Sequence, residues 1–471
     1  MGSVLKVVYE NKIELQDRTI TFSNGIPSAI VDYVKNNLIV EDNHDRDSDY
    51  FLDLVKNIDQ DWQGHIHLSD FYYYFARFYG HDRIVYIDDI VDNGYYIYPI
   101  ELVGKTASWL WQEFSIKLDN MVLNYRFGNH FKTKTLELLR AGRIKILVII
   151  IYDPCHDASF LDQFEQYISD LGIDPGNIIF LFGNNYNAHY KLSPSSKFKF
   201  TTGNILLQKT ALGYTNYPTM TTLGYVSDVV RETDATFHDL RPKKFLCFNR
   251  NMRSHRYILA YIAKKHNMLP SSIFSFISNL SDESAVRTII ENYTGDDISQ
   301  TELTDIINTV PLEIDTDHLD QGAKSGFQAV DNNKKEFYQN TYIHLTSETS
   351  FFGDPDDEPF FSEKTFRPIA NLQPFIMIGD VYSLRFLKKI GFKTFHPVID
   401  ETYDLETDHN QRMRLIEKEI VKLNNMSQRE LHDFYHSLLD ILIYNRNHFI
   451  TFKDSNPFQI SYEYIEQSCT V

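Results

Sequence analysis

The chain has 471 residues, 43% of them hydrophobic, and its 64 acidic and 46 basic residues give a formal net charge of −18. This length exceeds the number of residues that one ordinary hydrophobic core supports, so we expect two α/β domains. The hydrophobic content excludes long disordered tracts, and the negative charge disfavours nucleic acid as a partner.

Cysteine usage and the lack of long apolar segments indicate the compartment. Cys155, Cys247 and Cys469 lie far apart and form no CxxC pair, which favours a reducing environment. The first residues lack a basic segment followed by an apolar run. The longest apolar stretch, 144–152, is interrupted by Lys145 and fits a buried strand. We therefore expect a cytoplasmic protein without a membrane span, in the host cytoplasm if the chain is viral.

The first 240 residues contain one clear βαβ unit. Residues 145–152 are nearly all β-branched, as in a parallel strand covered on both faces, and Asp153 follows them. Residues 160–171 have helical apolar spacing, and 177–182 form the next strand. A strand, a helix and a strand within about 40 residues are the building block of a doubly wound sheet.

The strand and helix pattern restarts at Arg241, after a stretch rich in loop residues, and indicates a second α/β domain. Residues 281–335 are acidic and weakly patterned. The expected elements are strands at 244–248, 342–346, 375–378 and 393–395, and helices at 257–263, from 362, at 383–389 and over 410–447. We predict an acceptor-side domain over 1–240, a donor-binding domain over 241–447, and a tail, 448–471, that packs back on the first domain.

The strongest local signal is a polar cluster after the strand at 244–248. Three arginines fall within seven residues, at the carboxyl end of a strand and the start of a helix. Ligands of open α/β sheets bind at that end, and a helix amino terminus attracts anions. Guanidinium groups suit a diphosphate. The alternative is a surface helix start whose arginines pair with local acids. The cluster consists of Asn249, Arg250, Arg253, His255 and Arg256.

A second signal begins at Ser362, which can cap a helix. Glu363 can accept hydrogen bonds from a ribose diol, and Lys364 can neutralise a phosphate. The alternative is a capped surface helix with an i,i+4 pair between Glu363 and Arg367.

Together these segments resemble the donor-binding half of GT-B glycosyltransferases, in particular fucosyltransferase-like enzymes of large viruses, phages and bacteria. The resemblance covers about 243–447 and rests on NRxxRxHR, SETSFF (347–352) and FxSEKTFRPI (360–369). It implies two Rossmann-like domains facing across a cleft. It also implies a donor site, with Glu348 and Thr349 near the sugar, made of Asn249, Arg250, Arg253, Glu363 and Lys364. The first half of the chain matches no known pattern.

An inverting transfer needs a general base, and the expected source is the first domain. Asp153 and Asp157, with His156 between them, follow the strand at 145–152, and Asp88 and Asp89 are similar candidates. Each of these acids also fits an ordinary loop residue or helix cap, and a retaining enzyme needs no such base.

Other motifs are absent or weak. The acidic segment 353–358 fits a solvated loop better than a Mg²⁺ site, because it lacks the EF-hand ligand spacing. No GxGxxG, P-loop or GxSxG sequence occurs. We therefore expect no metal site and no cofactor besides the nucleotide-sugar co-substrate.

The sequence thus predicts a metal-independent glycosyltransferase that moves a sugar from a nucleoside diphosphate to a glycan or other hydroxyl acceptor. Two alternatives remain open at this stage. One is a non-catalytic binding protein on a GT-B shell, and the other is an enzyme that glycosylates hydroxylated bases of viral DNA.

Overall fold

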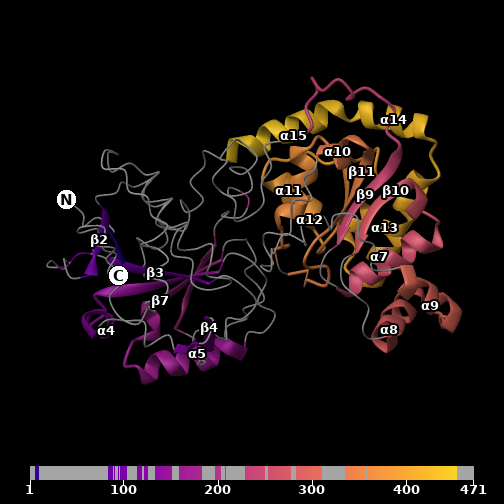
Figure 1. Cartoon of the computed structure of the whole chain (residues 1–471). Helices are drawn as coiled ribbons and strands as arrows, with labels where there is room; N and C mark the ends of the chain where they lie inside the picture. Colours follow the sequence, from indigo (N-terminus) through magenta and orange to yellow (C-terminus); the bar gives the residue numbers. More distant parts are fainter. Residues whose placement is uncertain are drawn as a thin grey trace. The chain divides into compact units, whose positions relative to one another are not determined.

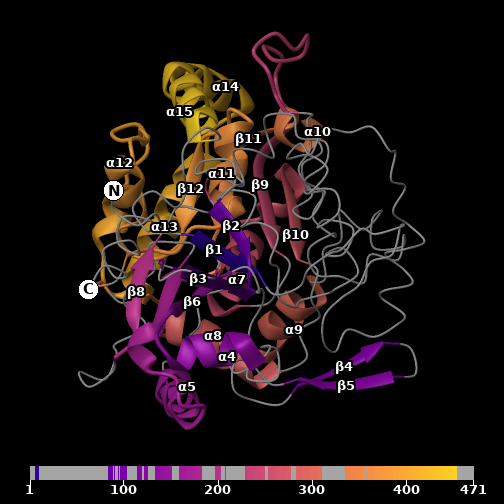
Figure 2. The same ribbon diagram turned by 90° about the vertical axis from the view of Figure 1, so that its left-hand side faces the viewer.

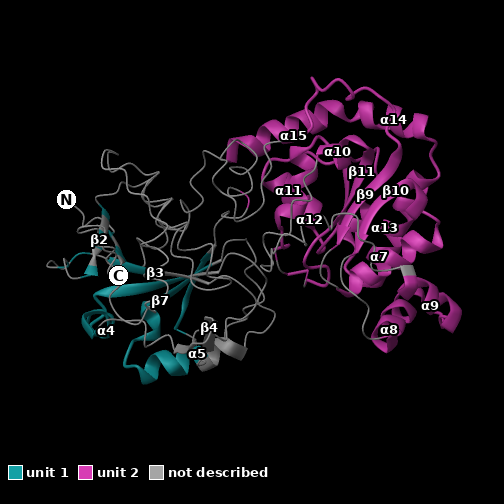
Figure 3. Ribbon diagram, viewed as in Figure 1, with its two compact units in different colours: residues 1–205, 456–471 teal, residues 206–455 magenta. Residues whose placement is uncertain are grey.

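The computed structural model of the chain divides into two compact units, residues 1–205 with 456–471 and residues 206–455, coloured separately in Figure 3. Each unit has a parallel sheet and helices, so the chain is an α/β protein. The structure describes residues 6–9, 83–87, 90, 94, 96–102, 114–118, 121–125, 133–150, 159–182, 197–202, 207, 229–249, 253–276, 283–309, 335–353, 355–356 and 358–452.

The first unit is built on a six-stranded parallel sheet in the order β2-β1-β3-β6-β7-β8. Its strands are β1 (Lys6–Tyr9), β2 (Ile84–Tyr86), β3 (Tyr96–Leu102), β6 (Ile144–Ile150), β7 (Ile178–Phe182) and β8 (Lys199–Thr202). Two further strands, β4 (Phe114–Leu118) and β5 (Met121–Tyr125), form an antiparallel pair. The helical elements are α4 (Thr133–Arg140), α5 (Ser159–Asp170) and the 3₁₀ turn η5 (Pro175–Asn177).

The predicted βαβ unit is present as β6, α5 and β7. Ile144, Ile146 and Val148 are completely buried in β6, and β7 pairs with it in parallel. Gly172 follows α5 with φ near +75°, a left-handed conformation that glycine adopts without strain.

The second unit has a four-stranded parallel sheet in the order β10-β9-β11-β12, which Figure 2 displays side by side. Its strands are β9 (Lys243–Asn249), β10 (Ser272–Phe276), β11 (Thr341–Ser347) and β12 (Phe375–Ile378). Helices α14 and α15 run along the top of the unit in Figure 1, and α8 and α9 lie at its lower end beside α7. The helices are α7 (Ser254–Lys265), α8 (Glu283–Thr294), α9 (Gln300–Thr309), α10 (Lys335–Gln339), α11 (Glu363–Ala370), α12 (Ser383–Lys389), α13 (His409–Asn424), α14 (Gln428–Ser437) and α15 (Leu439–Thr451), with 3₁₀ turns η7 (Leu269–Ser271) and η9 (Thr402–Leu405).

Strand order in the second sheet reverses at β9. The chain passes from β9 to β10 on one side and then returns to β11 on the other side. In open parallel sheets the crevice outside the carboxyl ends of two such strands is the usual ligand site. The relevant edge therefore lies where β9 and β11 end, after Asn249 and Ser347.

The predicted strand at 393–395 is wrong, because the described chain there has no strand. Phe395 donates its backbone N–H to the carboxylate of Glu401 instead, 2.6 Å away. This hydrogen bond ties the segment to a side chain rather than to a neighbouring strand.

Residues 229–240 belong to the second unit, although the sequence places the boundary at 240 and 241. Val230 and Phe237 are buried in the core of this unit. The two carboxylate oxygens of Glu232 accept hydrogen bonds from Arg446 at 2.7 and 2.8 Å. The division between units falls at residue 205. The predicted tail from 448 begins inside α15, and its residues after 452 lie outside the described part.

None of the helices in the described ranges combines the length and the apolar character that a membrane crossing requires.

Candidate functional site

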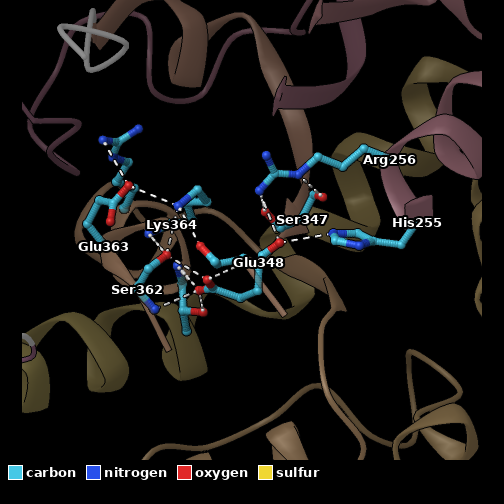
Figure 4. Close-up of polar contacts among 10 residues, drawn as sticks. His255, Arg256, Ser347, Glu348, Ser362, Glu363 and Lys364 are labelled. Atoms are coloured by element: carbon cyan, nitrogen blue, oxygen red, sulfur yellow. Dashed lines mark hydrogen bonds and ion pairs between the residues drawn. The ribbon is translucent and has the colours of Figure 1, made fainter. Parts of the chain in front are cut away.

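Three segments meet at the carboxyl end of the second sheet: the start of α7, the residues that follow β11, and the start of α11 (Figure 4). They contain five of the predicted site residues, namely Arg253, Glu348, Thr349, Glu363 and Lys364, and Asn249 ends the neighbouring strand β9. Arg250, the candidate bases Asp153 and Asp157, the similar candidates Asp88 and Asp89, and His156 lie outside the described residues.

Glu348 is a completely buried carboxylate that joins β11 to α11. One oxygen, Oε1, accepts hydrogen bonds from the backbone N–H groups of Ser362 and Thr365, both at 3.1 Å, and from the Thr365 hydroxyl at 2.5 Å. The other oxygen, Oε2, accepts from the Ser362 hydroxyl at 2.5 Å and from the N–H of Thr349 at 3.2 Å. The carboxylate thus occupies the position at the start of α11 where an external anion would otherwise bind.

Lys364 lies beside this junction and is partly exposed. Its ammonium group donates to the Ser362 hydroxyl at 3.0 Å, to Glu363 Oε1 at 3.2 Å and to the Thr349 hydroxyl at 3.5 Å. Ser362 caps α11, as the sequence predicts, and its hydroxyl accepts from the N–H of Lys364. The contacts hold the ammonium group over the segment that follows β11.

Glu363 is ionised over the whole physiological range. Burial raises the pKa of its carboxyl group, but the charges of Lys364 and Arg367 outweigh burial and lower that pKa to about 2. The Arg367 guanidinium lies 3.6 Å from the Glu363 carboxylate at i,i+4. The ion pair that the alternative interpretation of this motif predicts is therefore present. Glu363 also keeps about a fifth of its side chain exposed. An ionised, partly exposed carboxylate of this kind can accept hydrogen bonds from a diol.

The start of α7 differs from the start of α11, because the side chain of its N-cap residue makes no capping hydrogen bond. Arg253 occupies the N-cap position in an extended conformation and makes no side-chain capping hydrogen bond. The first N–H groups of a helix have no partner within the helix and carry the positive end of its dipole. An anion is therefore favoured at this helix start, next to the Arg253 side chain.

His255 and Arg256 face inward, whereas the sequence grouped them with the phosphate-binding cluster. His255 Nε2 donates to the carbonyl of Glu348 at 3.0 Å. Burial, together with the charge of Arg256, holds the pKa of His255 well below its usual range, so the ring is neutral at pH 7. Arg256 donates to the Ser347 hydroxyl and to the carbonyls of Ser347 and Glu348 at 3.0–3.3 Å. Both side chains serve to hold β11 against α7.

Asn249 and Thr349 lie at the ends of β9 and β11 and are almost fully buried. The Asn249 amide donates to the sulfur of Cys247 at 3.2 Å, while its carbonyl oxygen has no hydrogen-bond partner within the described ranges. Burial raises the pKa of the Cys247 thiol to about 12, so this cysteine is no nucleophile.

A turn that the sequence reading missed lies next to α7. Asp380, two residues after β12, accepts hydrogen bonds from the Ser350 hydroxyl at 2.7 Å and from the Gly353 N–H at 2.8 Å. Arg412 donates to the carbonyl of Phe351 and lies over its ring, 4.5 Å from the centroid. The turn presents Phe352, whose side chain is 47% exposed. The sequence signal for Asp380 is an acid placed two residues after a buried strand.

Within the described part of the chain, no three His, Cys, Asp or Glu residues are grouped so that they could hold a metal ion. No protein-family model matches the sequence, and no curated protein matches it either.

Proposed function

We propose that the chain is a glycosyltransferase of the GT-B type, which moves a sugar from a nucleoside diphosphate to an acceptor hydroxyl group. The observation that carries this proposal is the start of α7: a helix amino terminus with Arg253 at its N-cap position, at the point where strand order reverses. Helix termini at such points bind the phosphates of nucleotides in many α/β proteins. The resemblance of the surrounding motifs supports glycosyl transfer in particular.

Lys364 and Glu363 supply the complementary groups. Lys364 can exchange its 3.5 Å contact with Thr349 for a phosphate oxygen, while its other contacts keep the ammonium group in position. Glu363 can accept the ribose hydroxyl groups, because its carboxyl group stays ionised.

In the proposed reaction, the acceptor oxygen bonds to the anomeric carbon as the bond from that carbon to the diphosphate breaks. Arg253 and Lys364 stabilise the negative charge that develops on the departing diphosphate, the task that a metal ion performs in other transferases. In an inverting mechanism, Asp153 or Asp157 takes the proton of the acceptor hydroxyl.

We assign Glu348 a different task from the sequence expectation. Its carboxylate already accepts five hydrogen bonds and is fully buried, so it acts on the donor site by fixing Thr349 and the start of α11. It is a positioning residue rather than a contact to the sugar.

The test is a thermal-shift titration of the full chain with UDP, GDP, CMP, ADP and dTDP, with and without Mg²⁺. A ligand that binds only the folded state stabilises it by about 2.7 kcal/mol at a hundredfold excess over Kd. One nucleotide should raise the melting temperature without Mg²⁺, and Arg253→Ala and Lys364→Ala should each reduce that rise.

Two matched variants control for the loss of charge alone. Arg429 lies exposed on α14 and Lys264 lies exposed near the end of α7, so Arg429→Ala and Lys264→Ala should respond to nucleotide like the wild type. If no nucleotide shifts the wild type, the donor-site assignment is refuted. A shift without sugar transfer to any hydroxyl acceptor would identify a nucleotide-binding protein instead.

A further inference from the structure

The turn 349–353 fixes the backbone on both sides of an exposed aromatic ring. Asp380, itself only 4% exposed, binds Ser350 on one side of Phe352 and Gly353 on the other. Arg412, 1% exposed, binds the carbonyl of the preceding residue. Two buried charged groups thus each bind this short turn.

The space inside this turn is also filled. A Cβ atom added to Gly353 would lie 2.7 Å from the carboxylate of Asp380, which is closer than any side chain tolerates. Glycine is therefore required for the backbone to approach Asp380 this closely.

Neighbouring rings hold Phe352 from the side. The rings of Phe351 and His409 pack edge to face against Phe352, with centroids 5.2 and 5.1 Å away and nearly perpendicular planes. The centroid of the His255 ring lies 6.3 Å from that of Phe352, also in an edge-to-face arrangement. His255 belongs to the first turn of α7, so Phe352 lies directly beside the helix terminus of the proposed phosphate site.

An isolated exposed phenylalanine is ordinary on a protein surface. Phe352 differs because its backbone is fixed by buried charges and its ring is fixed by three other rings, yet 47% of the side chain stays exposed. A rigid, exposed aromatic ring is a stacking surface, and aromatic rings stack on any nucleobase. Its ordering cost has already been met in the free protein, which favours binding.

We propose that Phe352 is the platform on which the nucleobase of the donor stacks while the diphosphate binds at α7. The inference rests on the proposed function and adds the residue that makes the site prefer a nucleotide over its phosphate group alone. Base stacking tolerates any base, so Phe352 strengthens nucleotide binding without selecting uracil or guanine.

The test compares three variants by calorimetry, using the nucleoside diphosphate that binds the wild type best and inorganic pyrophosphate as the probe without a base. Phe352→Ala should weaken nucleotide binding about tenfold, within the range known for one stacked base, and change pyrophosphate binding less than twofold. Phe352→Trp should keep the nucleotide affinity of the wild type. The emission of the new indole should be quenched by the nucleotide but not by pyrophosphate. Leu405→Ala removes another exposed apolar side chain, 60% exposed, and should change neither.

Unchanged nucleotide affinity in Phe352→Ala would overturn the inference and leave the proposed function standing. An equal loss for nucleotide and pyrophosphate would overturn it too, because it would mean that the substitution had distorted the phosphate site. A wild type that binds no nucleotide would refute the proposed function and the inference together.

Discussion

The hydroxyl of Ser362 donates a hydrogen bond across 2.5 Å to the buried carboxylate of Glu348, and this contact joins the end of β11 to the start of α11. The same hydroxyl accepts from Lys364 Nζ at 3.0 Å. A single serine therefore connects the carboxylate that organises the helix start with the ammonium group that we expect to bind phosphate. The contacts around this pair lead to the predictions below.

Glu348→Gln should lower the free energy of unfolding of the second unit by about 2–3 kcal/mol, because an amide replaces one acceptor oxygen with a donor that faces N–H or O–H groups. Urea denaturation would measure the loss, and hydrogen exchange of the α11 segment would localise it. Glu358→Gln, on a side chain that is 36% exposed, is the matched control and should cost little. Equal stability of the two variants would contradict the role given to the Glu348 carboxylate.

Gly353→Ala should destabilise the chain by about 1–3 kcal/mol, because its Cβ meets the Asp380 carboxylate. Gly176→Ala is the comparison, since its nearest neighbour is a side-chain oxygen at an ordinary 3.5 Å. Thermal denaturation of both variants measures the difference. A similar melting temperature for the two variants would show that the turn can yield without cost.

Glu363→Gln should make stability less sensitive to acid. The pKa of Glu363 is about 2 in the folded chain and 4.5 ordinarily, so the folded state binds this proton less tightly. The resulting stabilisation is complete above pH 4.5 and is lost as the pH falls toward 2; about 1 kcal/mol is gone by pH 4. Urea midpoints of both proteins at pH 7 and pH 4 measure this, and a stability difference that stays constant between the two pH values would argue against an ionised, paired Glu363.

Arg256→Lys should cost about 2 kcal/mol, because a lysine cannot reproduce the forked contacts to Ser347 and Glu348 in a buried position. In the wild type this guanidinium is charged at pH 7, since burial and the charge of Arg253 lower the pKa of Arg256 only to about 10. Arg429→Lys, on an exposed side chain, is the matched control for urea denaturation. Full stability in Arg256→Lys would mean that these contacts contribute nothing.

Local patterns predicted much of the second unit. Continuous apolar runs indicated β9, β11 and β12, and α14 begins with a capping box, the reciprocal hydrogen bonds between Ser427 and Glu430. These features depend on residues a few positions apart, so the information lies within a short window of sequence. The strand order cannot be predicted from such a window, because it depends on which strand edges pair.

Side-chain direction was the part that sequence could not supply. The spacing after β9 put Arg253 and Arg256 at the same end of the sheet, but Arg256 turns inward because Ser347, 91 residues later, places acceptors there. The resemblance placed Glu348 near the sugar, and the sequence could not show that its carboxylate is buried. Its partners, 14 to 17 residues further along, become neighbours only when α11 packs behind β11.

Recombinant fragments of the second unit should be cut before residue 229. A fragment that begins at Arg241 would lack Val230 and Phe237 and would leave an uncovered apolar surface. It would also lack Glu232, the carboxylate that accepts hydrogen bonds from Arg446. We expect such a fragment to collect in inclusion bodies, whereas one that retains 229–240 should remain in the soluble fraction.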